Sequence, residues 1–223
     1  MSRGNGRMRI FLDDIDYRKF LHMLGDMLEA FGVECWDFCA MPTHYHLTVC
    51  PRQANLSRAL RHLNSVYAMW WNAKHEKVGH VFQGRFKDQI VQREGYLRAL
   101  CRYIALNPVR AGLVDHPAKW PWSSFRATAG LCRNPGFLFE DPVLAQFEGA
   151  DAKESRARYV HHVLAGIQEV DELADRFRSK ERVVGDPRFK VHVLGRAAVK
   201  PAGRELAVSG HNPGRVEIPT PLI

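Results

Sequence analysis

The stretch "MPTHYHLTV", residues 41–49, decides the fold predicted for this chain, because it sets two histidines in a run of strand-forming residues. Side chains alternate between the two faces of a strand, so His44 and His46 share one face and Tyr45 takes the other. Two imidazoles on one patch are compatible with a divalent metal ion, and also with a hydrogen-bonded pair in a protein core.

The residues around this strand predict a helix, a hairpin and a second helix. Residues 13–31 have apolar side chains at helical spacing, begin with aspartates and stop before Gly32, as an amphipathic helix does. Residues 33–40 and 44–50 read as two strands joined by a turn at Pro42 and Thr43. A second helix, capped by Asn55, runs to about Lys77, with these side chains inward: Leu56, Leu60, Leu63, Tyr67 and Trp70.

Two further elements complete the pattern of the first half. "GHVFQGRFKDQIV", residues 79–91, is typical of a short strand or a bent hairpin around Gly84. A third helix begins near Glu94 and ends at Asn107, because the residue before Pro108 is pushed out of the helical region. The order helix, strand, strand, helix, strand, helix indicates an α+β fold with an antiparallel sheet.

The second half has a different composition. "HPAKWPWSSF", residues 116–125, combines two tryptophans with two prolines and is expected to cover the core. Residues 141–193 predict a small helical unit, with "ESRARYVHHVLAGI" (154–167) and "EVDELADRFRSK" (169–180) as its clearest helices. The residues from 196 onward are basic and rich in Pro and Gly, so we expect disorder there.

Composition and cysteine usage exclude some classes of protein. The chain has 223 residues, of which 46% are hydrophobic, enough for one sizeable core. We expect no membrane partner and a cytoplasmic location, because no stretch is apolar enough to cross a bilayer or to act as a secretory signal. The five cysteines are expected to be reduced, although a zinc site from Cys35, Cys39, His44 and His46 is conceivable.

The charge of the chain is concentrated in one segment. Residues 52–110 contain eleven Lys and Arg but three acids, an excess equal to the formal net charge of +8 of the whole chain. This excess favours a polyanionic partner, most simply nucleic acid, or else marks a solvated basic face.

The third helix holds a second candidate for chemistry. Tyr103 and Asn107 are four residues apart, so they lie on one face of the helix, one turn from each other. A tyrosine can attack phosphorus, and an amide oxygen can complete a metal site made by two histidines. The same two residues can equally be a packed tyrosine and a helix stop before Pro108.

Three motifs, in this order and spacing, resemble the single-tyrosine HUH transposases, in particular the branch of REP-associated tyrosine transposases (RAYT) of bacteria. They are "MPTHYHLTV", "GHVFQGRFKDQIV" and "YLRALCRYIALNPVRAGLV" (96–114), and "SRGNGRMRIFLDDIDYRKFL" (2–21) resembles the N-terminal region of that family. The resemblance covers about residues 2–126. It implies a ferredoxin-like HUH domain over 1–126, which we expect to be followed by a helical accessory region over 127–195 and a disordered basic tail over 196–223.

The resemblance also implies a site and a reaction. His44 and His46 would bind a divalent ion, Mg or Mn, with Asn107 as third ligand and Tyr103 as the catalytic nucleophile. The implied enzyme is a transposase, a metal-dependent endonuclease and strand transferase of single-stranded DNA that forms a 5′-phosphotyrosine intermediate on hairpin-forming repeats. Its expected partner is single-stranded or hairpin DNA, and we expect a monomer or a homodimer.

Within this interpretation the basic segment would follow the DNA backbone. Phe82 or Phe86 could stack on bases, unless they belong to the core. The basic residues expected to contact DNA are Arg58, Arg61, Arg85, Lys87 and Arg102.

The sequence departs from the family pattern in three places. Family members have a strand before the "RGN" motif, beside the histidine strand. Here Met1 directly precedes Ser2, so we expect that strand to be missing. We expect either that the true start codon lies upstream or that this chain is an impaired relic. Thr43 stands where Asn is common, and Ala105 replaces a frequent His, which lowers the expected activity.

Two rival functions stay open at this point. One is a catalytically inactive relic or regulator that binds hairpin DNA without cutting it. The other is a zinc-containing hydrolase or regulator that uses Cys35, Cys39 and the two histidines.

Overall fold

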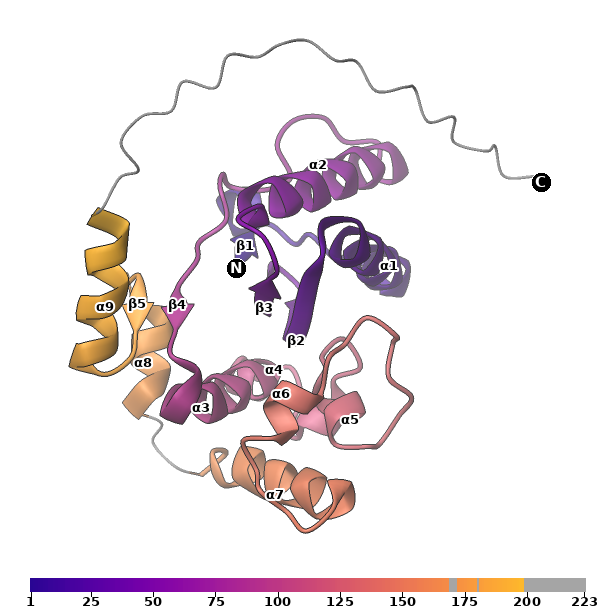
Figure 1. Cartoon of the computed structure of the whole chain (residues 1–223). Coiled ribbons are helices and arrows are strands. Elements are labelled where there is room, and N and C mark those ends of the chain that lie inside the picture. The colour runs from indigo at the N-terminus through magenta and orange to yellow at the C-terminus, as the bar shows by residue number, and fades with distance from the viewer. Residues whose placement is uncertain (169–171, 180, 199–223) are drawn as a thin grey trace.

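The structure, a computed structural model, describes residues 1–168, 172–179 and 181–198 (Figure 1). Its first half is a three-stranded antiparallel sheet in the order β1–β3–β2. Two helices, α1 and α2, cover one face of the sheet, and α3 packs on the other face (Figure 1). The bounds are β1 Ser2–Arg3, α1 Asp14–Phe31, β2 Val33–Met41, β3 His44–Pro51, α2 Leu56–Lys74 and α3 Arg93–Ala105.

A fourth segment extends this sheet beyond β1. Gly4 and Phe82 form an antiparallel bridge. The backbone N–H of Gln83 donates to the carbonyl of Arg3 at 2.9 Å, and the N–H of Lys87 donates to that of Met1 at 2.8 Å. The sheet therefore has the segment 81–87, β1, β3 and β2 side by side, which is the antiparallel order of a ferredoxin-like fold and confirms the predicted α+β class.

A two-residue strand lies beside the histidine strand, where we expected the strand to be missing or truncated. This strand, β1, pairs with β3 so that Ser2 lies opposite Tyr45 and Arg3 opposite His44. Its backbone is hydrogen-bonded on both sides, to β3 and to the segment 81–87. The predicted segment 79–91 is less regular than a strand or hairpin. Its pairing includes the Phe82 bridge, the hydrogen bonds of Gln83 and Lys87 to residues 1–3, and β4 (Ile90–Val91).

The two helices on the first face follow the prediction closely. Asp13 caps α1 by accepting the backbone N–H of Asp16, and Gly32 ends it with a φ of 60°. α2 ends at Lys74, three residues earlier than predicted. Asn55 stands at its N-cap position without a capping bond, because its side chain donates to the carbonyl of Phe31 at 2.8 Å.

The buried face of α2 differs from the prediction at one position. Trp71, at 3% exposure, is in the core, and Trp70 is only partly buried at its edge. Leu60, Leu63 and Tyr67 are buried as predicted, and Leu56 packs against the core from its rim.

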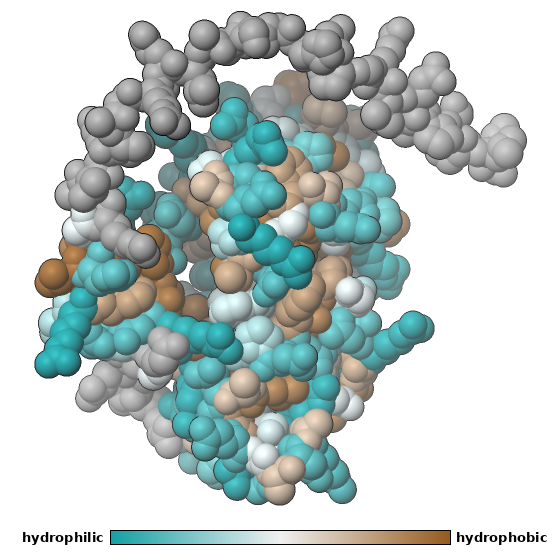
Figure 2. Space-filling model, viewed as in Figure 1, coloured by the Kyte–Doolittle hydropathy of each residue, from teal (hydrophilic) through white to brown (hydrophobic). Residues whose placement is uncertain are grey.

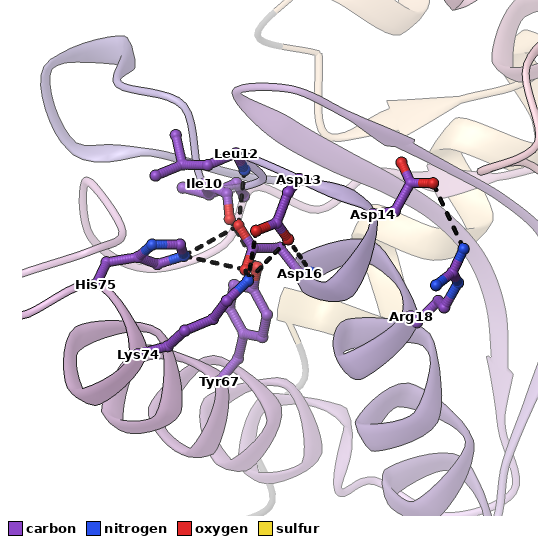
Figure 3. Close-up of polar contacts among 9 residues, drawn as sticks. All are labelled: Ile10, Leu12, Asp13, Asp14, Asp16, Arg18, Tyr67, Lys74 and His75. Carbon is purple, nitrogen blue, oxygen red and sulfur yellow. Dashed lines mark hydrogen bonds and ion pairs between the residues drawn. The ribbon is translucent and has the colours of Figure 1, made fainter.

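A buried carboxylate fastens the start of α1 to the end of α2 (Figure 3). Asp16 has no solvent exposure and accepts the N–H of Leu12 at 2.7 Å, the Lys74 ammonium at 2.6 Å and His75 Nε2 at 3.0 Å. Lys74 also bonds Asp13 at 2.7 Å. Because every charge in this cluster has a partner, the network fixes the angle between the two helices and so the position of the sheet beneath them.

The third helix continues past the predicted stop. α3 ends at Ala105, and after Leu106 a further turn, α4, covers Asn107–Arg110. Pro108 does not end the helical path because it lies in the first turn of α4, where no backbone N–H has an intrahelical partner to lose.

In the described residues of the second half, the regular structure consists of short helices and one short strand. β5 pairs parallel with β4, and with α8 and α9 it forms a unit beside α3 (Figure 1). Figure 2 shows apolar residues at the surface of this unit, where Ile90, Val191 and Leu194 are exposed. The elements are η1 Asn5–Arg7, η2 Pro117–Lys119, α5 Phe125–Thr128, α6 Asp141–Leu144, α7 Ala152–Ala165, α8 Glu172–Arg178, β5 Val183–Val184 and α9 Pro187–Ala198.

Two expectations about the end of the chain change. The pattern missed β5, and α9 reaches Ala198, so residues 196–198 are helical instead of disordered. The rest of the predicted tail, 199–223, lies outside the described residues. Across the ranges that the structure covers, no helix is long and apolar enough to cross a membrane.

Candidate metal and nucleophile site

The two histidines of β3 face α3, and the tyrosine between them faces away. The rings of His44 and His46 have centroids 5.0 Å apart, and the ring of His46 meets Tyr103 of α3 edge-on at 5.7 Å. Tyr45 lies on the opposite face, with its ring 4.7 Å from that of Phe20. The fold therefore brings the predicted nucleophile next to the predicted metal pair.

Both histidines are held neutral. Burial lowers the pKa of His44 to about 4, with further lowering by the charges of Arg3 and the N-terminal ammonium. Burial also lowers the pKa of His46 well below its usual value, as do His44 and the same two charges. Neutral imidazoles have a lone pair to offer a cation, so this pair fits a divalent ion.

The rest of a metal site must come from oxygen ligands. Within the part of the chain that the structure covers, no group of three or more His, Cys, Asp or Glu side chains could hold a metal ion. Asn107 is half-buried one turn after Tyr103, and its Nδ2 donates to the carbonyl of Tyr103 at 2.7 Å. The structure thus ties the predicted third ligand to the predicted nucleophile.

Tyr103 is enclosed by apolar and cationic groups. Its exposure is 6%, and the ring of Phe177, from α8, lies 5.6 Å away. The guanidinium carbons of Arg110 and Arg178 lie 5.9 Å and 5.8 Å from its ring centroid. Two positive charges beside a phenol form an electrostatic environment that favours a phosphate group.

The zinc alternative does not match the geometry. Cys39 lies opposite His46 and packs in the cluster around Tyr103, whereas Cys35 is in the core under α1 and α2. The reason is a register shift between Cys35 and Asp37, because one extra residue in a strand moves its earlier side chains to the other face. The four proposed zinc ligands therefore do not converge.

The predicted DNA-binding residues occupy two separate places. Arg58 and Arg61 are exposed on α2, and Arg85 and Lys87 are exposed on the segment at the sheet edge. Arg102 is half-buried on α3, where its Nε donates to the carbonyl of His162 at 2.9 Å in α7. It therefore joins α3 to α7 at a distance from the other four.

The two predicted stacking rings are both in the core rim. Phe82 and Phe86 are partly buried and pack against the main cluster, and Phe82 meets Tyr45 at 6.2 Å. Their contacts are those of core residues, which was the alternative considered for them.

Sequence patterns missed four residues that surround the site. They come from segments far apart in the sequence, so no local pattern connects them with the histidines. Three of them gave only the signal of a basic residue, and they are Arg3, Arg110 and Arg178. The fourth, Phe177, gave only the signal of apolar spacing.

Comparison with known proteins identifies the first half of the chain. Residues 2–107 match the family model described as transposase IS200-like. A solved structure described as a REP-associated tyrosine transposase bound to a REP hairpin is similar, with 19% sequence identity and a TM-score of 0.49. The matched region covers 68% of this chain and 82% of the other chain. A search of curated proteins finds no significant match.

The match spans the strand that carries His44 and His46 and ends at Asn107, so it contains every predicted metal ligand and the tyrosine. The sheet order, the histidine pair and the family model agree with one another. The first half of the chain, residues 2–107, is therefore similar to the IS200-like transposases.

Proposed function

We propose that this protein is a metal-dependent endonuclease and strand transferase of single-stranded DNA, of the REP-associated type, with Tyr103 as its nucleophile. The observation that carries the proposal is the contact between Tyr103 and His46, whose ring centroids are 5.7 Å apart. Two elements that are distant in the sequence bring a candidate nucleophile and a neutral histidine pair to one point, an arrangement suited to metal-assisted phosphoryl transfer.

In the proposed reaction Tyr103 acts on the phosphorus of a DNA phosphodiester. A bond forms between its phenolic oxygen and phosphorus, the bond from phosphorus to the 3′-oxygen breaks, and the phenol loses the proton that the 3′-oxygen gains overall. The products are a 5′-phosphotyrosine and a free 3′-hydroxyl. Strand transfer reverses the step with another 3′-hydroxyl, so no nucleotide cofactor is needed.

The residues that would hold the ion are His44, His46 and Asn107. Mg²⁺ or Mn²⁺ bound there would supply positive charge that polarises the scissile phosphate. The chain itself adds the guanidinium groups of Arg110 and Arg178 beside the nucleophile, where they can stabilise charge on the phosphate oxygens.

We propose single-stranded or hairpin DNA as the partner, on the basis of exposed charge. Arg58 and Arg61 on α2, with Arg85 and Lys87 at the sheet edge, present four cations without side-chain burial. Such residues neutralise phosphates without reading the base sequence. The half-buried Arg102 is the weakest of the proposed contacts, because its Nε is engaged with α7.

A second function is favoured by one observation. Tyr103 is almost fully buried beneath Phe177. A protein that kept this arrangement with DNA bound would hold a hairpin without cutting it, as a binding protein or regulator does.

The test is covalent trapping on hairpin DNA. Labelled single-stranded oligonucleotides are chosen from any hairpin-forming inverted repeats in the DNA beside the gene. They are incubated with Mn²⁺ or Mg²⁺ and separated on a denaturing gel. We expect a slowly migrating adduct that needs the metal and is absent with Tyr103→Phe. The matched control is Tyr96→Phe, the same substitution on the same helix, which should leave the adduct unchanged.

The outcomes separate the two functions. Hairpin binding that is equal in the wild type and Tyr103→Phe, with no adduct from either, would establish the binding protein instead. An adduct that persists in Tyr103→Phe and disappears in Tyr96→Phe would show that the nucleophile is assigned to the wrong tyrosine.

A further inference from the structure

Arg3 lies on the same face of the sheet as the histidine pair. In the pairing of β1 with β3, Arg3 is opposite His44 and Ser2 is opposite Tyr45. Residues directly opposite in an antiparallel pair project to the same face. Ser2 therefore accompanies Tyr45 beneath α2, and Arg3 projects beside His44 towards the candidate site.

This register is held on both sides of β1. The hydroxyl of Tyr45 donates to Asn64 Oδ1 at 2.7 Å, and Asn64 Nδ2 donates to the Ser2 hydroxyl at 3.0 Å. On the other edge, the N–H of Gln83 donates to the carbonyl of Arg3 at 2.9 Å. A slip by one residue would break all three bonds, so the side chain of Arg3 is fixed on the histidine face.

The guanidinium group of Arg3 has an unused donor. Its Nε is buried and has no hydrogen-bond partner. A buried donor left in this state destabilises the fold, so a ligand that accepts a hydrogen bond there would recover the lost free energy.

The position of Arg3 also matters for a cation at the histidines. Arg3 lies opposite His44 in the pairing of β1 with β3, on the face of the sheet that carries both imidazoles. Its positive charge opposes a second cation at this pair. An anion bound between the Arg3 guanidinium and an ion at the histidines reduces this repulsion, because each positive charge then faces a negative one.

We propose that Arg3 is an anion subsite of this centre, which binds a non-bridging oxygen of the DNA phosphate that contacts the ion held by His44 and His46. The inference rests on the proposed function and extends it to the residue that receives the phosphate. It predicts that the metal ion and DNA bind cooperatively, and that Arg3 is the source of the cooperativity.

The test measures Mn²⁺ affinity with and without DNA. The proteins carry Tyr103→Phe, so that no covalent adduct forms. Free Mn²⁺ is followed by electron paramagnetic resonance in the presence and absence of saturating oligodeoxythymidylate, with the DNA alone as a blank. We expect DNA to tighten Mn²⁺ binding by about tenfold or more, the effect of one hydrogen bond to a charged group.

Three further substitutions decide the role of Arg3. Arg3→Gln should abolish the effect of DNA while leaving the affinity for Mn²⁺ alone equal or tighter, because a neighbouring positive charge is gone. Arg3→Lys should keep part of the effect, since it retains the charge without the planar fork. Arg18→Gln should keep the whole effect of DNA, because Arg18 is an exposed residue of α1, which covers the opposite face of the sheet.

The outcomes distinguish this inference from the proposed function. Full cooperativity in Arg3→Gln, or a loss of Mn²⁺ binding in both Arg3→Gln and Arg3→Lys without DNA, would overturn the anion subsite. Cooperativity that depends on Arg3, in a protein whose wild type forms no adduct, would support the subsite and refute the nuclease.

Discussion

At the scale of single residues, the buried carboxylate of Asp37 makes the stability of the fold depend on pH. Asp37 of β2 is 3% exposed, and burial raises its pKa to about 7, although hydrogen bonds from Ser124, the N–H of Phe38 and Cys101 oppose the rise. The pKa of an unfolded aspartate is about 3.9. Between these values the folded protein binds more protons than the unfolded chain.

The sign of the pH effect follows from this difference. The free energy of unfolding should be highest at low pH, where the folded state is most stable. It should fall as pH rises through about 7, by at most about 1.4 kcal/mol per pH unit from this group. Asp37→Asn should remove this component of the slope. Urea unfolding near pH 5 and near pH 8 measures it. The control is Asp14→Asn, at an exposed residue of α1 that pairs with Arg18, and it should keep the slope. An unchanged slope in Asp37→Asn would contradict the assignment.

At the scale of elements, α8 covers the proposed nucleophile. The ring of Phe177 lies 5.6 Å from that of Tyr103, and Ala174 and Val184 complete the same cluster. Tyr103 is 6% exposed, so under the proposed function we expect α8 to limit the access of a DNA phosphate to it.

Removing the covering ring should therefore speed the reaction. Phe177→Ala removes the packing contacts of a buried phenylalanine, a change that usually costs about 3–5 kcal/mol of stability. Their loss favours displacement of α8. We expect adduct formation to be about tenfold faster or more, measured by the rate of the covalent band. Phe139→Ala, at a residue 44% exposed on a loop, should not change the rate. A slower reaction in Phe177→Ala would indicate that α8 is part of the reactive arrangement.

At the scale of the whole molecule, the unit of α8, β5 and α9 is joined to the domain by few polar contacts. The N–H of Gln92 donates to the carbonyl of Val184 at 2.8 Å, and its side chain bonds Asp186 twice, as donor to Oδ2 and acceptor from N–H, both at 2.8 Å. Gln89 adds bonds to the carbonyls of Arg176 and Glu181 at 3.0 Å and 2.7 Å.

The unit of α8, β5 and α9 should open locally, without unfolding of the rest of the protein. Gln92→Ala removes two side-chain hydrogen bonds, worth about 1–3 kcal/mol together, so amide hydrogen exchange in residues 181–198 should become about tenfold faster or more. Exchange in α1 and α2 should not change, because their core does not include this unit. Gln53→Ala, on an exposed loop, is the control. Equal acceleration throughout the chain would show that the molecule opens as one unit.

Local patterns determined the elements of this protein and one half of its site. The alternation of a strand is a property of the backbone, so it placed His44 and His46 together and Tyr45 opposite without any tertiary information. The helical period likewise placed Tyr103 one turn from Asn107, and the caps at Asp13 and Gly32 located α1. The family resemblance then predicted that these two halves form one site, and residues 2–107 match the model of IS200-like transposases.

Only the tertiary structure decided how distant segments meet. The register shift after Cys35, the pairing that sets Arg3 beside His44, and the packing of Phe177 on Tyr103 all depend on contacts between residues far apart in the sequence. Each is selected by the packing of the whole core, because many local arrangements are nearly equal in free energy until burial and hydrogen bonding distinguish them.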